Sequence, residues 1–264
     1  MSAFYSSTVL GTPVYLVLWF FLAYSFLGVV TECLFFLGCE GVLESTTGLL
    51  YLPLRPLYGI GGCGFAVLLR PVVAQPAAVF VLGAVIATVV EYGASLLTDV
   101  AFEAASWDYS HKPLNLHGRV CLVYSLGWGG LALVAVYLFD APLRTLLAQL
   151  PLTTGEEVLT VVLALVLASA VLTVAALTRA RRRVLGLRAA AQGGGPAPTP
   201  TAWERVVDRF VPDPVLINSF PRMTLTTELG RLTGQRRAWV RLGPRARTAL
   251  LVNEQDPTRA RGAA

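Results

Sequence analysis

The stretch VYLVLWFFLAYSFLGVVTECLFFL, from Val14 to Leu37, carries a single charged residue, Glu32. A helix needs about 20 mostly apolar residues to cross roughly 30 Å of hydrocarbon, and this stretch is longer than that. It is also too long for the apolar core of a signal peptide, and no basic residue precedes it. It therefore predicts a transmembrane helix that remains in the protein.

The whole chain shares this apolar character. Of its 264 residues, 55% are apolar and 14% are charged, and the mean hydropathy is +0.63. A soluble domain carries about 25% charged residues. Three further segments are long and apolar enough to span a bilayer, and they run from Ala77 to Ala101, from Val120 to Phe139 and from Val158 to Leu177. This composition predicts an integral membrane protein.

A fifth apolar segment, from about Leu54 to Val73, is interrupted by Pro56 and by the run GIGGCG at Gly59 to Gly64. Such a segment is either a bent span or a re-entrant loop, and both are tolerated only where the backbone is buried in protein or lines a wet cavity. The predicted fold is therefore an all-α, polytopic membrane bundle with about five transmembrane helices, the second of them broken or re-entrant.

Charge divides the chain into two parts. Up to Thr178 there are 5 basic and 10 acidic residues, whereas from Arg179 onward there are 16 and 6. The cluster RARRR directly follows the last span, so the positive-inside rule places the C-terminal tail in the cytoplasm and the spans in the cell membrane. Five spans then put the N-terminus outside and the loops with Arg55 and Arg119 inside. Four spans with a re-entrant loop would instead put the N-terminus inside.

We divide the chain into a transmembrane domain at 1–188, a Pro- and Gly-rich linker at 189–201 and a weakly folded basic tail at 202–264. In the tail, WERVVDRF at Trp203 to Phe210 has apolar residues at helical spacing together with two arginines. This helix lies against anionic lipid or docks on a partner. No nucleic-acid recognition motif is present, and attraction to the inner leaflet explains the charge more simply.

Three carboxylates fall within the apparent spans: Glu32 in the first, and Glu91 and Asp99 in the third. Placing such a group at the bilayer centre costs about 2.5 to 3.5 kcal/mol on insertion scales, so membrane-embedded acids are usually functional and face the bundle. Glu91, Ser95 and Asp99 are four residues apart and share one helix face. They form either a hydrogen-bonded cluster that only fixes the bundle or a substrate, ion or proton site. Pairing of Glu91 or Asp99 with Arg55 or Arg119 is a further hypothesis.

The segment FEAASWDYSHKPLNLHGR, at 102–119, is richer in polar and aromatic chemistry than a connecting loop requires. It is either an aromatic interface belt with ordinary turn residues or a site whose side chains converge on a polar ligand. Its two histidines are six residues apart, and the four cysteines of the chain are scattered, so we expect no metal and no cofactor. The candidate site residues of this loop are Trp107, Asp108, Tyr109, Ser110, Asn115, His117 and Arg119.

Four stretches resemble a bacterial membrane family, the CmpB-like or type IV ABC-transporter family. They are WFFLAYSFLGVVTE at 19–32, LPLRPLYGIGG at 52–62, EYGASLLTDVAF at 91–102 and WDYSHKPLNLHGRVCLVYSLGWG at 107–129. They follow the family's order over roughly residues 15 to 140, and the family usually has Glu where Asp99 stands and Asn where His117 stands. By this resemblance, the residues that occupy the family's motif positions are Tyr24, Ser25, Gly28, Glu32, Pro56, Tyr58, Gly59, Glu91, Tyr92, Trp107, Asp108, Tyr109, Ser110, Asn115, Gly118, Arg119, Ser125 and Trp128.

Three functions are consistent with these residues. The first is a permease or transport-associated subunit with a polar site at Glu91 and the WDYS loop, since transport sites use broken helices and midplane charges. The second is an intramembrane enzyme or binding protein for a lipid head group, with Asp108 or His117 as base and Arg119 as anion clamp. The third is a non-catalytic sensor or assembly factor.

The chain has no G-x-x-x-x-G-K-[ST] phosphate loop, so it does not supply an ATPase of the usual kind. The permease interpretation therefore requires a separate ATPase subunit and, because five spans form a small pathway, a homodimer. No catalytic nucleophile is identifiable, and the residues favour a non-enzymatic role. The expected functional residues are Glu32, Arg55, Tyr58, Glu91, Ser95, Asp99, Trp128 and the loop residues named above.

Overall fold

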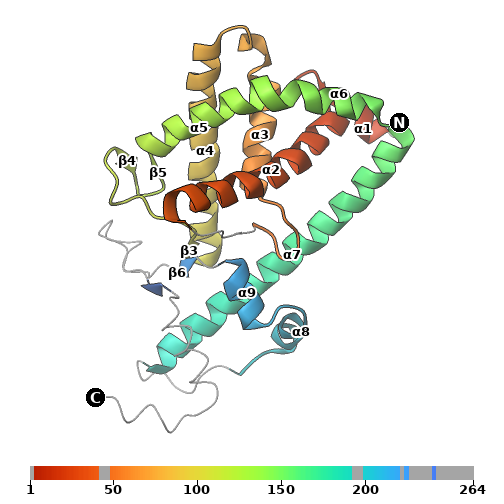
Figure 1. Ribbon diagram of the computed structural model, residues 1–264. Helices are drawn as coiled ribbons and strands as arrows, with labels where there is room; N and C mark the ends of the chain where they lie inside the picture. Colours follow the sequence, from red (N-terminus) through yellow and green to blue (C-terminus); the bar gives the residue numbers. More distant parts are fainter. Residues whose placement is uncertain (1–2, 42–47, 192–198, 221–222, 226–239, 242–264) are drawn as a thin grey trace.

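The computed structural model describes residues 3–41, 48–191, 199–220, 223–225 and 240–241, and most of these are helical (Figure 1). The helices are α1 (Ala3–Ser6), α2 (Val14–Glu40), α3 (Pro56–Leu68), the short η1 (Arg70–Val72), α4 (Pro76–Phe102), α5 (Leu122–Val134), the π-helical η2 (Ala135–Asp140), α6 (Ala141–Gln149), α7 (Leu152–Ala191), α8 (Ala202–Phe210) and α9 (Asp213–Ser219). The predicted all-α membrane bundle is confirmed.

The strands are two residues long and only tie loops together. They pair as β1 (Thr8–Val9) with β2 (Thr12–Pro13), β4 (Asn115–Leu116) with β5 (Val120–Cys121), and β6 (Thr224–Leu225) with both β3 (Ala104–Ala105) and β7 (Val240–Arg241). All of these pairings are antiparallel.

Four helices of the described chain are long and apolar enough to cross a membrane: Val14–Cys39, Pro76–Phe102, Leu122–Gln149 and Leu152–Gly186. The interrupted fifth segment forms the 13-residue helix α3. At 1.5 Å per residue α3 is about 20 Å long, which is shorter than the roughly 30 Å hydrocarbon layer. Pro56 starts this helix, because a proline at the first helical position loses no hydrogen bond.

Helix α3 packs closely against α2 between Val17 and Gly28. The backbone N–H of Arg55 donates to the carbonyl of Ser25 at 3.0 Å, which fixes where α3 begins beside α2. A Cβ atom at Gly62 would lie 2.2 Å from the Tyr24 ring, and one at Gly28 would lie 2.3 Å from the Tyr58 ring. The two helices therefore approach this closely only because small residues occupy the contact.

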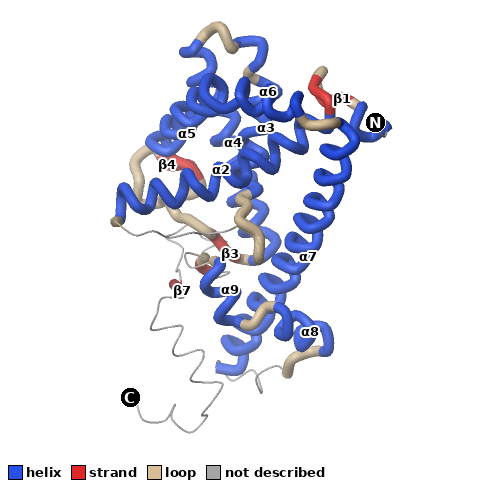
Figure 2. Tube along the Cα trace, turned by 45° about the vertical axis from the view of Figure 1, so that its right-hand side comes forward, coloured by secondary structure: helices blue, strands red, loops and turns tan. Residues whose placement is uncertain are grey.

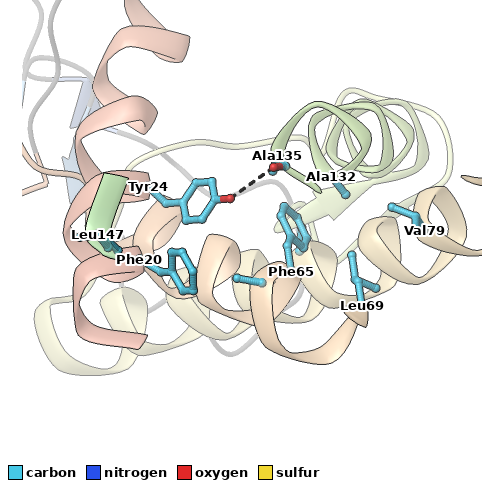
Figure 3. Close-up of a cluster of buried hydrophobic side chains, with 10 residues drawn as sticks. Phe20, Tyr24, Phe65, Leu69, Val79, Ala132, Ala135 and Leu147 are labelled. Atoms are coloured by element: carbon cyan, nitrogen blue, oxygen red, sulfur yellow. Dashed lines mark hydrogen bonds between the residues drawn. The ribbon is translucent and has the colours of Figure 1, made fainter. Parts of the chain in front are cut away.

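The main apolar core joins α2, α3, α4 and the α5 to α6 region. Phe20, Phe65, Leu69 and Val79 are buried in it, and Figure 3 shows Tyr24 reaching from α2 to the carbonyl of Ala135. That hydrogen bond is 3.3 Å long. The carbonyl belongs to Ala135, the first residue of η2, seven residues before Pro142. Because Pro142 cannot donate to residue 138, the regular α-helical hydrogen-bond pattern is interrupted in this region.

Two contacts show which helix ends lie together. The Tyr5 hydroxyl lies 2.7 Å from the Thr160 hydroxyl, so the first helices lie beside the start of α7. Arg181, near the end of α7, pairs with Glu103 at the end of α4 at 2.6 Å. Figures 1 and 2 show α7 running along one side of the other membrane helices. The starts of α2 and α7 therefore lie at the same end of the domain.

The predicted helix at 203–210 is present as α8, and α9 follows it. Val207, Val211 and Leu216 of this region are buried together with Leu50 and with Ala176 of α7. The part of the predicted tail at 226–239 and 242–264 lies outside the described residues. The described part of the tail therefore packs on the membrane domain through its own small core.

Candidate functional site

The predicted polar face of α4 is buried. Glu91, Ser95 and Asp99 continue a buried stripe with Gly83 and Ala87, four residues apart along the helix. Glu91 is 3% exposed. Its carboxylate accepts hydrogen bonds from the Trp128 indole N–H at 3.0 Å and from the Tyr109 hydroxyl at 3.2 Å. Both donors are neutral, and among the described residues no basic side chain forms an ion pair with this carboxylate.

Tyr109 reaches Glu91 from the loop that follows α4. Its backbone N–H donates to the Gly118 carbonyl at 2.8 Å, and its ring stacks on Tyr124 with centroids 4.6 Å apart. Burial raises the pKa of the Tyr109 hydroxyl, and the charge of Glu91 raises it further. The hydroxyl therefore keeps its proton at physiological pH and acts as a permanent donor to the acid.

A cavity of about 340 Å³ lies beside this acid, between α2, α3, α4 and the α5 to η2 region. Tyr58 and Trp128 line it with their ring centroids 5.0 Å apart. Trp128 thus contacts both the cavity and the Glu91 carboxylate. Tyr58 lies within electrostatic reach of Glu32, Arg55 and Glu91. The complete lining is Tyr24, Leu27, Gly28, Val30, Thr31, Leu34, Leu57, Tyr58, Gly61, Gly62, Phe65, Ala87, Val90, Trp128, Leu131, Val134, Ala135 and Phe139.

Two turns further along α4, Asp99 forms an ion pair with Arg119. The guanidinium N–H lies 2.5 Å from the carboxylate, and both side chains are 8% exposed. Arg119 also donates to the Ser95 hydroxyl at 3.1 Å, and its backbone carbonyl accepts the Trp107 indole N–H at 2.8 Å. The hypothesis of an acid paired with Arg119 therefore holds for Asp99 and not for Glu91.

Glu32 and Arg55 form a second ion pair, between α2 and the residue that precedes α3. Arg55 donates through two nitrogens to the two carboxylate oxygens of Glu32. This pair neutralises the acid of the first span and connects the start of α3 to α2. Its geometry is the bidentate arrangement that makes arginine and carboxylate pairs strong.

Four other predicted site residues shape the loop. Asp108 accepts from the backbone N–H and the hydroxyl of Ser110, and Asn115 accepts from the backbone N–H of Gly118 at 2.9 Å. His117 is exposed, contacts the Tyr92 hydroxyl at 2.9 Å and has a φ of 55°. These residues do not line the cavity. Their hydrogen bonds fix the turn that presents Tyr109 and Arg119 to α4.

The structure therefore brings the predicted residues into three groups: Glu91 with Tyr109 and Trp128, Asp99 with Ser95 and Arg119, and Glu32 with Arg55. Sequence reasoning missed Tyr124 and the apolar lining of the cavity, which includes Phe65, Leu131 and Ala135. Part of the lining could have been predicted from residue spacing, because Leu131 and Ala135 fall on the same helix face as Trp128. In the part of the chain that the structure describes, no three His, Cys, Asp or Glu side chains are close enough to hold a metal ion.

Long apolar helices with buried, hydrogen-bonded acids are typical of a multi-pass membrane protein. A family match associates this membrane protein with transport. Residues 19–174 match the family described as "Putative ABC-transporter type IV". Because this match covers more than half of the chain, the chain belongs to that family, and the resemblance seen in the sequence is confirmed. No curated protein and no solved structure matches the chain significantly.

Proposed function

We propose that the chain is the permease, or a transport-associated membrane subunit, of an ATP-driven transport system and that the cavity beside Glu91 is its substrate site. The family match and the membrane-spanning helices support the general class. The arrangement of α2 to α5 around the cavity supports the substrate site. A mostly apolar cavity with a few polar groups in its lining is the usual form of a small-molecule site.

The observation that carries this proposal is Glu91 itself. It lies well inside the α4 span, it is 3% exposed, and its partners are two neutral donors. A carboxylate in hydrocarbon is costly, and partnering by an arginine would offset that cost, as Arg119 does for Asp99. An unneutralised acid next to a cavity is therefore better explained by a bound proton or cationic group than by bundle stability alone.

The short helix α3 supports the same proposal. It is preceded by non-helical residues at 48–55 and supplies Tyr58, Gly61 and Gly62 to the cavity wall. Interrupted helices near the middle of the membrane expose backbone and side-chain groups where transporters bind substrates. The π-helical η2 also contributes to the cavity lining through Ala135 and Phe139, and π segments often occur at functional positions.

The same proposal assigns sidedness and partners. We place the RARRR end of α7 in the cytoplasm and the chain in the cytoplasmic membrane. Because α1 and α2 begin beside the start of α7, the N-terminus then lies outside. A separate ATPase subunit and a second copy of the chain complete the transporter. Protease should remove the tail from inverted membrane vesicles and leave it intact in right-side-out vesicles, and the reverse result would overturn this orientation.

The lipid head-group enzyme is less well supported. It requires Asp108 or His117 as a base and Arg119 as an anion clamp around one substrate. Asp108 is bonded to Ser110 in its own turn, and Arg119 is buried against Asp99. None of these side chains lines the cavity or hydrogen-bonds to a side chain of its wall, whereas Glu91, itself outside the lining, accepts from Trp128 of the wall.

Transport is tested by comparing inverted vesicles that contain wild-type chain, Glu91→Gln or the control Glu157→Gln, each together with its copurifying ATPase. The substitution Glu91→Gln keeps the shape of the side chain, and Glu157 is exposed at the start of α7. Mass spectrometry of the vesicle contents should find a compound whose amount changes with ATP in wild type and Glu157→Gln and not in Glu91→Gln; a rise inside these vesicles indicates an exporter and a fall indicates an importer. The absence of any ATP-dependent difference would contradict the proposal.

A further inference from the structure

Helix α8 has three distinct sides. Val207 and Glu204 face the protein and are buried. Val206 and Phe210 are 58% and 61% exposed, and Trp203 is 37% exposed. Arg205 and Arg209 are also exposed, on the sector next to the exposed apolar residues. The side of α8 that no described residue covers is therefore amphipathic, with apolar residues flanked by arginines.

A network of ion pairs fixes α8 to the end of α7. Arg179 is fully buried and donates to Asp208 at 2.5 Å, to Asp213, and to the carbonyl of Val211 at 2.7 Å. Arg183 pairs with the same two aspartates. The orientation of α8 about its own axis is therefore set by charges on the protein side, and the apolar sector is left facing outward.

The contacts with α7 also set the depth of α8 in the membrane. Val207 and Val211 pack in one cluster with Ala176, which belongs to the apolar span of α7. At the other end of α8, Arg182 lies over the Trp203 ring at 5.6 Å and 3.6 Å from Glu204. From Ala176 to Arg182, α7 rises about 9 Å. The C-terminal end of α8 is thus level with the last apolar residues of α7 before Arg179, and its N-terminal end is level with Arg182, farther along α7.

Contacts with the loop between α2 and α3 agree with this inclination. The Tyr51 hydroxyl donates to the Phe210 carbonyl at 2.5 Å. The neighbouring Leu50 is fully buried, and its backbone N–H donates to the Thr173 hydroxyl of α7 at 3.0 Å. Phe210 therefore lies at the level of the last turns of the α7 span, whereas Trp203 lies near the arginine cluster.

We propose that the exposed side of α8 is a membrane-surface anchor that inserts Phe210 and Val206 into the leaflet where α7 ends and binds anionic lipid head groups through Arg205 and Arg209. Apolar residues beside arginines, held at the depth where a span leaves the hydrocarbon, have the chemistry of an interfacial helix. Anionic lipid attracts each such basic residue near the surface. This anchor is independent of the substrate site at Glu91.

The test uses the wild-type chain in bilayers of phosphatidylcholine with phosphatidylglycerol, in which a photoactivatable diazirine is carried on the acyl chain. Trypsin cuts after Arg205 and Arg209, so Val206 and Phe210 fall in separate peptides. We expect lipid adducts on both peptides, with more on the Phe210 peptide when the diazirine is deep in the chain. Adducts confined to the spanning helices would overturn the anchor.

A matched variant separates the two parts of the proposal. With both Arg205→Gln and Arg209→Gln, labelling of α8 should fall to the level seen in pure phosphatidylcholine, because both residues are exposed and neither belongs to the ion-pair network of Arg179. Equal labelling in neutral and anionic bilayers would overturn the role of the arginines. Protection of the α8 peptides by a copurified ATPase, without lipid adducts, would assign this surface to a protein partner instead.

Discussion

The ion pair of Asp99 and Arg119 gives the most quantitative prediction. Asp99→Asn leaves the Arg119 guanidinium, 8% exposed, with neutral partners only. Removing one partner of a buried pair costs about 3 to 5 kcal/mol, whereas an exposed pair is worth about 0 to 1 kcal/mol. We expect about 3 kcal/mol, near the lower end of the buried range, because the Ser95 hydroxyl remains as an acceptor.

The double substitution Asp99→Leu with Arg119→Met removes both charges together. Because no unpaired buried charge then remains, the double variant should be more stable than Asp99→Asn. Thermal unfolding in mild detergent measures this, and about 3 kcal/mol corresponds to a fall in Tm of about 6 to 12 °C for a domain of this size. Glu157→Gln, an exposed control, should stay within about 0.5 kcal/mol of wild type. A loss below about 1 kcal/mol for Asp99→Asn, or a double variant that is no more stable than Asp99→Asn, would refute the reasoning.

Three further predictions follow from local geometry. Gly62→Ala should cost about 1 to 3 kcal/mol in thermal unfolding because its Cβ would meet the Tyr24 ring. Gly61→Ala should not destabilise the protein, because a Cβ at Gly61 would have nothing within 4 Å. Equal effects of the two substitutions would contradict the close approach of α2 and α3. At His117, with φ 55°, Asn should be tolerated and Val should cost about 1 to 2 kcal/mol, and a Val variant as stable as Asn would argue against this turn. A hydrogen bond from the α8 N-cap backbone lowers the pKa of Glu204, so its stabilisation of α8 should be complete above about pH 4.3 and lost as the pH falls through the lowered value. Hydrogen-exchange protection factors of α8, corrected for the slower intrinsic exchange in acid, should therefore fall on acidification, and unchanged protection factors would contradict this.

The spans were predictable because membrane helices are long and uniformly apolar. The segments expected at Val14 to Leu37 and Ala77 to Ala101 correspond to α2 and α4 within a few residues. The fourth of the five expected spans, from Val120, was expected to stop at Phe139, but its helix continues through η2 and α6 to Gln149. Hydropathy alone does not show that a helix continues into a polar segment such as α6.

The polar face of α4 was predictable because four-residue spacing fixes the side of a helix. The side chains that pair with Glu91 and Asp99 were not predictable, because they depend on the path of the loop after α4. The left-handed residues Leu114, His117 and Gly118 turn that loop so that Arg119 meets Asp99 and Tyr109 meets Glu91. The packing of α8 on α7 was also not predictable from the sequence. It depends on ion pairs of Arg179, and nothing in the cluster RARRR distinguishes this arginine from the others.

The central claim, that the cavity beside Glu91 binds a substrate, is tested most directly by native mass spectrometry of the chain purified in mild detergent. Wild type, Glu91→Gln and Glu157→Gln are compared at equal protein concentration. We predict a bound small molecule in wild type and Glu157→Gln that is lost from Glu91→Gln, while thermal unfolding shows all three to be folded. The same bound species in all three proteins, or none in any, would contradict a substrate site at Glu91.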